Sequence, residues 1–226
     1  MFQNLINLFF PNVCLSCNHE LLDNEIYICT NCRHDLPVTN YHLDGYDQVK
    51  KAFYGRVKLE NASALLRFQK KGIVQQLMHN LKYKGHQEIG TFLGAWLGDE
   101  LKNIVDYKDI DLVIPVPLHK RKRRKRGYNQ VTLFSKEIAN CMNIESLTSV
   151  LVKVSDASSQ VNKSRLARWS SNKEVFAIQN LNLIDNKHVL LVDDIITTGA
   201  TIEACANQLL KAKNVKISVA TMAIVE

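Results

Sequence analysis

The 226-residue sequence lacks the features that direct proteins into or across membranes. It has no apolar run that approaches the ~18–20 residues of a membrane-spanning helix. Residues 1–10 (MFQNLINLFF) are apolar but contain no Lys or Arg, so they lack the basic start of a secretory signal. We therefore expect a cytoplasmic protein with neither a targeting segment nor a membrane span.

The chain also has little excess charge outside one short segment. It carries 29 Lys and Arg against 22 Asp and Glu, a formal net charge of +7. Seven cations are consecutive, which leaves 22 charges of each sign elsewhere. They are Lys120, Arg121, Lys122, Arg123, Arg124, Lys125 and Arg126. We expect a loop here, and we expect any polyanionic partner to bind it; a solvated basic loop is the alternative.

The pattern of apolar residues indicates an α/β fold. Short apolar runs predict buried strands at residues 111–117, 150–154, 189–192 and 215–225. Apolar residues that recur every three or four positions predict helices at residues 62–85, 89–101, 127–142 and 202–211. Strands that alternate with such helices are typical of a parallel sheet flanked by helices, with right-handed crossovers.

Four of the six cysteines form two C-x2-C pairs near the start of the chain. Cys14 and Cys17 make the first pair, Cys29 and Cys32 the second, with eleven residues between the pairs. Two thiolates close in sequence can chelate one ion, and two such pairs complete the tetrahedron of a structural zinc site. Two disulfides or a redox-active C-x2-C are the alternatives. The missing secretion signal argues against disulfides, and the duplication argues against a redox motif.

A metal site of this kind folds a segment too short to have a core of its own. We therefore place a zinc ribbon at residues 1–40, followed by a second domain at residues 41–226. His19 and His34 lie just outside the two cysteine pairs, and we interpret both as surface residues rather than ligands.

Residues 188–201 (HVLLVDDIITTGAT) combine a strand, an acidic pair, a hydroxyl-rich loop and a helix start. The apolar run suits a strand buried on both faces, and Asp193 and Asp194 follow it. We expect a loop over residues 195–201 and a helix capped by Thr201. Backbone N–H groups at a helix start bind phosphate. The two carboxylates can accept hydrogen bonds from a ribose diol or attract Mg²⁺.

This segment resembles the phosphoribosyl-pyrophosphate (PRPP) binding motif of type I phosphoribosyltransferases. Other phosphate-binding or acidic motifs fit less well. A Walker-type loop would need a second glycine followed by Lys. A response-regulator receiver would need a whole α/β domain in the thirty-two residues after Asp194. A buried strand that ends in a capped turn without a ligand is the remaining alternative.

Three further segments carry candidate binding residues. Residues 115–119 (PVPLH) end a predicted strand at the carboxyl edge, where ligands of open α/β sheets gather. Lys82 and Lys84 end a predicted helix, where they either contact a phosphate or satisfy the helix C-terminus. The polar residues between 155 and 176 either share one helix face or form a solvated surface; they are Gln160, Arg165, Arg168 and Asn172.

Taken in order, these segments resemble the ComF family, also called amidophosphoribosyltransferase-like or competence protein ComFC. The sequences that carry the resemblance are LKYKG (81–85), PVPLH (115–119), RGYNQ (126–130), the polar segment and the PRPP-type motif, behind a four-cysteine ribbon. The resemblance covers nearly the full length. It implies a type I phosphoribosyltransferase domain behind a zinc ribbon. For some members it implies a role in natural transformation, in handling incoming single-stranded DNA.

The resemblance also implies a role for each part of the candidate site. Asp193 and Asp194 would hold the ribose hydroxyls of PRPP and are the candidate catalytic residues. The 5′-phosphate would be cradled by Thr197, Thr198, Gly199, Ala200 and Thr201. The pyrophosphate, with Mg²⁺, would face Val116, Leu118, His119, Lys120 and Arg126. The basic run would form a lid that closes over the leaving group.

Two functions of different classes remain open. The first is an enzyme that transfers a phosphoribosyl group to a nitrogen or oxygen acceptor, with fixed cations and Mg²⁺ stabilising the departing pyrophosphate. The second is a non-catalytic module for single-stranded DNA. In that module the basic run contacts phosphates, Tyr128 stacks on a base, and the pocket holds PRPP or a nucleotide for regulation or anchoring. Proteins of the DNA-uptake machinery are the expected protein partners.

Overall fold

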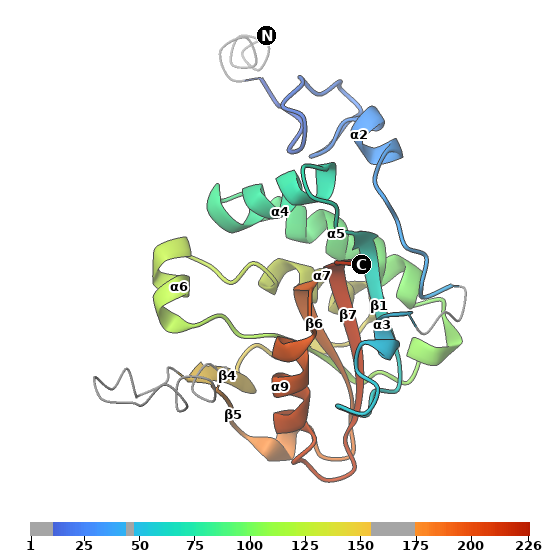
Figure 1. Ribbon diagram of the computed structural model, residues 1–226, viewed down its shortest axis with the longest axis vertical. Helices are drawn as coiled ribbons and strands as arrows, with labels where there is room; N and C mark the ends of the chain where they lie inside the picture. The colour runs from blue at the N-terminus through green and yellow to red at the C-terminus, as the bar shows by residue number, and fades with distance from the viewer. Residues whose placement is uncertain (1–10, 44–47, 155–174) are drawn as a thin grey trace.

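The computed structural model describes residues 11–43, 48–154 and 175–226. At its centre is a five-stranded parallel sheet in the order β1-β7-β6-β2-β3 (Figure 1). Its strands are β1 (Ala62–Arg67), β2 (Leu112–Pro115), β3 (Glu145–Ser146), β6 (His188–Ile196) and β7 (Lys216–Ile224). β6 lies between β2 and β7 and pairs with both in parallel. The carboxyl ends of these three strands therefore share one edge of the sheet.

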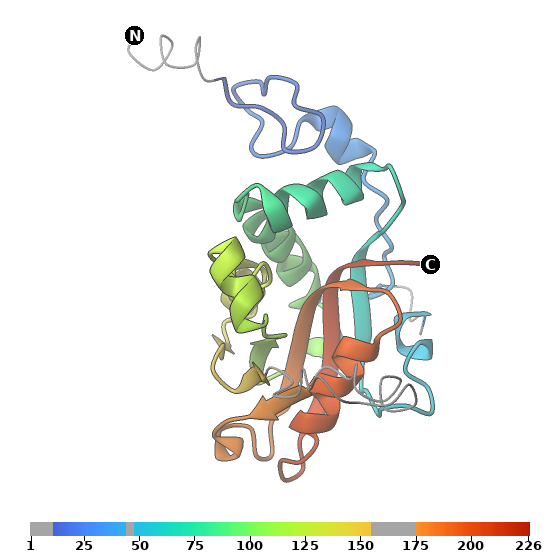
Figure 2. The same cartoon turned by 60° about the vertical axis from the view of Figure 1, so that its left-hand side comes forward.

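Helices cover both faces of this sheet (Figures 1 and 2), with α4, α5 and α7 on one face and α3 and α9 on the other. The helices of the described residues are α2 (Thr30–His34), α3 (Gln48–Lys51), α4 (Ile73–Tyr83), α5 (Glu88–Leu101), α6 (Lys120–Arg126), α7 (Thr132–Met142) and α9 (Ala200–Leu209), with short 3-10 helices η1 (Val105–Tyr107) and η2 (Leu181–Leu183). In the described part of the chain, no helix combines the length and apolar character that crossing a bilayer requires.

The central strand β6 is apolar at successive positions because both of its faces are buried. Leu190 and Val192 pack into the core formed with α4, α5 and α7. Val189 and Leu191 pack into the opposite core, which includes residues of α3 and α9. All four side chains are fully buried. The predicted α/β class, a parallel sheet flanked by helices, is confirmed.

The prediction of a helix from residue 62 is wrong for its first part, which is strand β1. Ala64, Leu65 and Leu66 are consecutive and fully buried, so apolar cores lie on both sides of this segment, as they do for a strand between two helical layers. The helical spacing begins only at Ile73, where α4 starts. The helices expected between 73 and 142 are confirmed as α4, α5 and α7.

The strand predicted at residues 150–154 forms outside the main sheet. β4 (Leu151–Val154) pairs antiparallel with β5 (Val175–Ile178) in a separate two-stranded ribbon. Val150, Leu151 and Phe176 are buried in the core on the α9 side. The apolar run therefore reflects burial of this ribbon against the domain and not membership of the parallel sheet.

The basic run forms a helix, α6, rather than the predicted loop. The ring of His119 accepts a hydrogen bond from the N–H of Arg121 at 3.2 Å and caps the helix start. Gly127, with φ of 86°, ends the helix in the left-handed conformation. Lys and Arg are strong helix formers, so charge alone was a poor guide to the backbone here.

The four-cysteine segment packs on the main domain at two places. The side-chain amide of Asn80 on α4 donates to the carbonyl oxygen of Leu15 at 2.7 Å. Residues 37–40, predicted to be a linker, run along β1, where Val38 forms an antiparallel bridge with Leu66. This pairing satisfies backbone groups at the outer edge of the sheet.

Helices α5 and α7 approach closely where α5 carries glycines. A Cβ atom on Gly94 would lie 2.7 Å from the carbonyl oxygen of Phe134 on α7. A Cβ atom on Gly98 would lie 2.9 Å from the Cα of Ile138. In contrast, a Cβ atom on Gly90 would make an ordinary contact, 3.4 Å from the nitrogen of Phe134.

We predict opposite effects for alanine at two positions of α5. Gly94→Ala should lower the free energy of unfolding by roughly 1–3 kcal/mol, because the new methyl group overlaps the backbone of α7. Gly90→Ala should be neutral or stabilising by up to about 1 kcal/mol, because alanine is the better helix former. Urea unfolding measures both variants. Equal stability of the two would show that the helices do not pack at this distance.

Candidate functional site

The acidic pair lies at the carboxyl end of β6. Asp193 and Asp194 are each 7% exposed. The strand does not stop before them, as predicted, but continues to Ile196, because this stretch keeps its pairing with β7. Oδ1 of Asp193 accepts a hydrogen bond from the N–H of Asp194 at 2.8 Å.

The turn after β6 is tighter than predicted. It spans residues 197–199, and Gly199, with φ of 74°, is the N-cap of α9. Glycine adopts this left-handed conformation readily, so the chain passes from strand to helix in three residues. The prediction of Thr201 as the N-cap is wrong, since Thr201 is the second residue of the helix.

Three segments far apart in the sequence meet at the carboxylate of Asp194. Its Oδ2 accepts from Nζ of Lys82 at 2.7 Å and from Nε2 of Gln130 at 2.8 Å. Its Oδ1 accepts from the N–H of Ile195 at 2.7 Å. The side chains of Asp194 and Lys82 are 11% and 21% exposed. Removing one partner would leave the other as a poorly solvated charge.

The turn after β2 lies directly beside the acidic pair. The N–H of Val116 donates to the carbonyl oxygen of Val192 at 2.8 Å, and Val192 precedes Asp193. The side-chain amide of Asn129 donates back to the carbonyl oxygen of Val116 at 3.0 Å. These bonds bring the predicted pyrophosphate segment, with Leu118 half-buried, to the same sheet edge as the carboxylates.

The basic helix α6 is connected to Asp194 through one side chain. The guanidinium of Arg126, the last residue of α6, donates to Oε1 of Gln130, whose amide nitrogen donates to Asp194. The same guanidinium lies 5.4 Å from the ring centroid of Tyr83. A series of contacts therefore runs from α6 to the carboxylate.

Tyr128 is held in place beside this series. Its hydroxyl donates to the carbonyl oxygen of Leu81. Burial raises the pKa of Tyr128 above its ordinary value, and the nearby Arg126 charge opposes this only in part. The hydroxyl therefore stays protonated near neutral pH, as this donor role requires.

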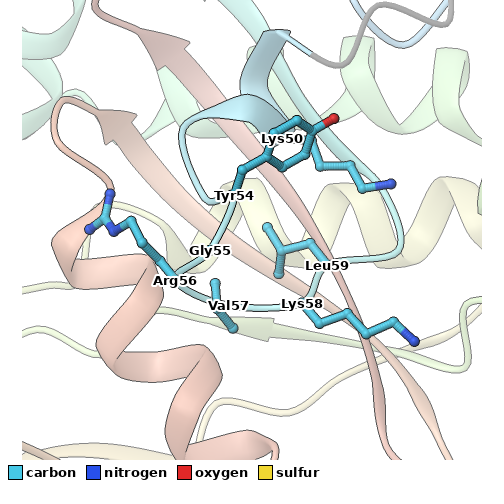
Figure 3. Close-up of a pocket in the computed structure, with 7 residues that line it drawn as sticks. All are labelled: Lys50, Tyr54, Gly55, Arg56, Val57, Lys58 and Leu59. Atoms are coloured by element: carbon cyan, nitrogen blue, oxygen red, sulfur yellow. The ribbon is translucent and has the colours of Figure 1, made fainter.

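The 197–201 segment is supported by residues before β1. Nη1 of Arg56 donates to the carbonyl oxygen of Thr198 at 2.7 Å, and its Nε donates to the carboxylate of Glu203 on α9 at 2.9 Å. A Cβ atom on Gly199 would lie 2.7 Å from the ring of Phe53. Figure 3 shows the side chain of Arg56 extending toward the helix that Figure 1 labels α9.

The segment before β1 that contains Arg56 also borders an open hollow of about 600 Å³. Lys50 and Tyr54 line one side of it and Lys58 the other (Figure 3). Arg56 is thus both a lining residue of this hollow and the group that holds the turn after β6.

The cations of α6 divide between two sides of the helix. Lys120 and Arg123 line a hollow of about 200 Å³ beside Leu118. Lys122 and Lys125 face the opposite side, toward the end of α4. Within the residues that the structure describes, none of the seven cations forms an ion pair with a carboxylate.

The four cysteines form one cluster that can hold a metal ion such as zinc. All four are free thiols, and their Sγ atoms lie within 4.8 Å of one another. The Sγ atoms of Cys17 and Cys29 are 3.7 Å apart. A tetrahedral zinc ion with bonds of about 2.3 Å separates its sulfur ligands by roughly 3.8 Å. The geometry therefore fits a zinc ribbon, and His19 and His34 lie exposed outside the cluster.

Backbone donors favour the thiolate form of Cys14. The N–H groups of Ser16 and Cys29 point to Sγ of Cys14 at 3.5 and 3.3 Å. Burial opposes ionisation of Cys14, but backbone donors of residues 17, 29 and 16 outweigh it and lower its pKa to about 7. The thiolate is the form that binds metal.

Comparison with known proteins identifies a domain family for part of the chain. Residues 128–226 match the phosphoribosyl transferase domain family. Competence protein F of Haemophilus influenzae is 32% identical over 102 residues, which cover 45% of this chain and 44% of that protein. Competence protein ComFC of Bacillus subtilis is 26% identical over 216 residues, 93% of this chain and 83% of that protein. The chain is a relative of the ComF competence proteins.

Other matches are more limited. The chain spans about half the length of the first curated relatives it matches. A glutamine PRPP amidotransferase from B. subtilis, solved in complex with ADP and GMP, is similar with a TM-score of 0.42 and 16% identity. That similarity covers 63% of this chain and 30% of that chain.

Sequence reasoning missed several residues that shape the site in this ComF relative. Lys82 pairs with Asp194, a partner that neither interpretation of Lys82 named. Gln130 belongs to the RGYNQ motif, and its place just before a helix at the ligand edge was a usable signal. Phe53 and Arg56 gave no signal, because they act through contacts with a turn about 145 residues later. Gln160, Arg165, Arg168 and Asn172 lie outside the described residues.

We predict about one zinc ion per chain of this ComF relative in protein purified under reducing conditions. Cys17→Ser should reduce the zinc content and lower the Tm, because Cys17 is exposed and its loss removes a ligand with little loss of packing. Cys141→Ser, a change of thiol on α7, is the matched control and should retain the metal. Two disulfides and no metal in reduced protein would exclude the site.

Proposed function

We propose that this chain binds PRPP at the carboxyl end of β6 and transfers its phosphoribosyl group to a nitrogen or oxygen acceptor. The observation that carries the proposal is the buried pair Asp193 and Asp194, followed by a three-residue turn into α9. Carboxylates there can accept hydrogen bonds from the ribose hydroxyls. Backbone N–H groups of the 197–201 segment can donate to the 5′-phosphate.

The turn after β2 is the proposed site of the pyrophosphate. The N–H of Val116 donates to the carbonyl oxygen of Val192, the residue before Asp193, and Leu118 and His119 follow Val116 in the same turn. Lys120 and Arg126 begin and end the basic helix. In the transfer step the bond between C1 of the ribose and the pyrophosphate oxygen breaks, the acceptor nitrogen or oxygen bonds to C1, and the acceptor's proton is released to solvent. Negative charge grows on the leaving group, where fixed cations stabilise it.

The residues present fit Mg²⁺ that arrives with the pyrophosphate. Mg²⁺ prefers oxygen ligands and commonly binds one or two carboxylates together with substrate phosphates. We assign contacts with the ribose hydroxyls to both Asp193 and Asp194, and either carboxylate can also contact the ion. The ion would supply charge neutralisation for the leaving group.

The remaining parts of the proposal concern the whole protein. A structural zinc ion at Cys14, Cys17, Cys29 and Cys32 would organise residues 1–40, and residues 41–226 would form the transferase domain. A reducing compartment such as the cytoplasm keeps thiols available for metal. The names of the relatives support a role in natural competence.

A second candidate function is binding of single-stranded DNA without catalysis. The observation that favours it is the exposed helix α6, whose seven cations have no carboxylate partner among the described residues. Such a helix can track a phosphate backbone, with Tyr128 nearby as an aromatic group. The PRPP pocket would then serve as a regulatory site, and proteins of the DNA-uptake machinery would be the partners.

Calorimetric titration with PRPP and Mg²⁺ tests the first function. Asp193→Asn combined with Asp194→Asn should weaken PRPP binding by at least about tenfold, because the charge-assisted hydrogen bonds to the ribose are lost. Inorganic phosphate should still bind, because the 197–201 segment is intact. The charge-matched control Asp99→Asn with Asp109→Asn changes two exposed carboxylates and should bind PRPP like the parent.

Assays of pyrophosphate release and of DNA binding separate the two functions. Release of pyrophosphate from PRPP in the presence of a suitable acceptor supports the enzyme. Binding of single-stranded DNA by the Asp193→Asn, Asp194→Asn variant, with no turnover in the parent, supports the module. Unchanged PRPP binding in that variant would contradict the assignment of the acidic pair.

A further inference from the structure

A cavity between the end of α4 and the basic helix α6 has an unusual combination of side chains. Its volume is about 360 Å³. The side chains that line it are Lys82, Tyr83, Lys122, Lys125, Arg126 and Tyr128. Four of these carry positive charge and two are aromatic. No carboxylate lines the cavity within the described residues.

The charges of this cavity favour an anionic ligand. Three cations come from one side of α6 and the fourth, Lys82, from α4. Lys82 is paired with Asp194, but a neutral heterocycle would leave Lys122 and Lys125 without an anionic partner, whereas a phosphate group would accept hydrogen bonds from both. The volume lies within the range of small-molecule sites, ~300–1,000 Å³.

The aromatic rings of the cavity favour a ligand that also has a planar group. Tyr83 is 71% exposed, and an exposed ring beside cations is the arrangement on which nucleic-acid bases stack. The guanidinium of Arg126 lies over one face of the Tyr83 ring, 5.4 Å from its centroid, so a base would stack on the rest of this exposed ring. Tyr128 is fixed by its bond to the carbonyl oxygen of Leu81. A ligand that satisfies both requirements carries a phosphate and a planar base.

We propose that this cavity binds a nucleoside 5′-phosphate unit, either as a free nucleotide or as part of single-stranded DNA. The inference builds on the proposed PRPP site, because Lys82 lines the cavity and also pairs with Asp194 at 2.7 Å. A ligand in the cavity therefore shares Lys82 with the proposed ribose position. The phosphate contacts Lys122 and Lys125, and the base stacks on Tyr83.

The experiment measures binding of three probes to the full chain by calorimetry. They are thymidine 5′-monophosphate, thymidine, and a 5′-phosphorylated tetrathymidylate. Thymidine should bind at least about tenfold more weakly than its monophosphate, because it lacks the charged group. The monophosphate binding as well as the oligonucleotide indicates a free nucleotide as the ligand. Much tighter binding of the oligonucleotide indicates single-stranded DNA.

Variants of α6 locate the site. Lys122→Gln with Lys125→Gln should weaken binding of the monophosphate by roughly tenfold or more. Arg121→Gln with Arg124→Gln removes the same charge from the same helix, but these side chains do not line the cavity. This variant should therefore lose clearly less affinity for the monophosphate. Lys211→Gln with Lys213→Gln, two exposed cations beyond α9, controls for net charge and should bind like the parent.

Variants of Tyr83 test the stacking. Tyr83→Ala should weaken binding of the monophosphate by about fivefold or more. Tyr83→Phe keeps the ring and should retain most of the affinity. The proposal is overturned if none of the phosphorylated probes binds, if thymidine binds as well as its monophosphate, or if both α6 variants lose binding equally.

PRPP titrations keep this result separate from the proposed function. Nucleotide binding by the Asp193→Asn, Asp194→Asn variant, with PRPP binding lost, supports both proposals. Nucleotide binding by a parent protein that does not bind PRPP supports the cavity and contradicts the PRPP site. PRPP binding by a parent protein that binds no phosphorylated probe supports the PRPP site and contradicts the cavity.

Discussion

The parallel pairing of β6 with β2 and β7 decides where the candidate site lies. β6 is buried on both faces, and its register is that of its pairing, which places Val192 opposite Pro115 of β2 and Ala220 of β7. That register brings two carboxylates to the carboxyl edge beside the turn after β2. The contacts at the acidic pair depend on this one arrangement of strands.

The second constraint is the set of contacts that Asp194 makes. A carboxylate that is 11% exposed needs partners, and Lys82 supplies one from α4 and Gln130 another from the turn before α7. Because Gln130 also accepts from Arg126, the basic helix and the acidic pair belong to one hydrogen-bonded series. A phosphate that engaged Arg126 would compete with Gln130, and ligands at the two places would then influence each other.

Much of the fold and part of the site could be predicted from the sequence. Two of its features are local patterns, whose geometry follows from neighbouring residues. They are the two C-x2-C pairs with the spacing of a ribbon and the strand–Asp-Asp–turn–helix motif. β1 was mistaken for a helix because Leu65 and Leu66 are buried by layers that only the tertiary structure creates. The basic run was expected to be a loop because its charge masked the helix propensity of Lys and Arg.

The contacts that support the site were not predictable in the same way. Arg56 meets Thr198, and Lys82 meets Asp194, across more than a hundred residues of sequence. No periodicity or spacing records such pairs, since they arise only when the crossover connections bring the segments together. Gln130 is intermediate, because its motif was visible but its partner was not.

A crystal structure of the chain grown with PRPP and Mg²⁺ tests the proposed site at the carboxyl end of β6. The ribose hydroxyls should lie within hydrogen-bond distance of Asp193 and Asp194, and the 5′-phosphate should lie on the backbone N–H groups of residues 197–201. The pyrophosphate should lie beside Val116 and Leu118. Density for PRPP at another surface, with the Asp194–Lys82 pair unchanged and the turn after β6 empty, would contradict the proposed site.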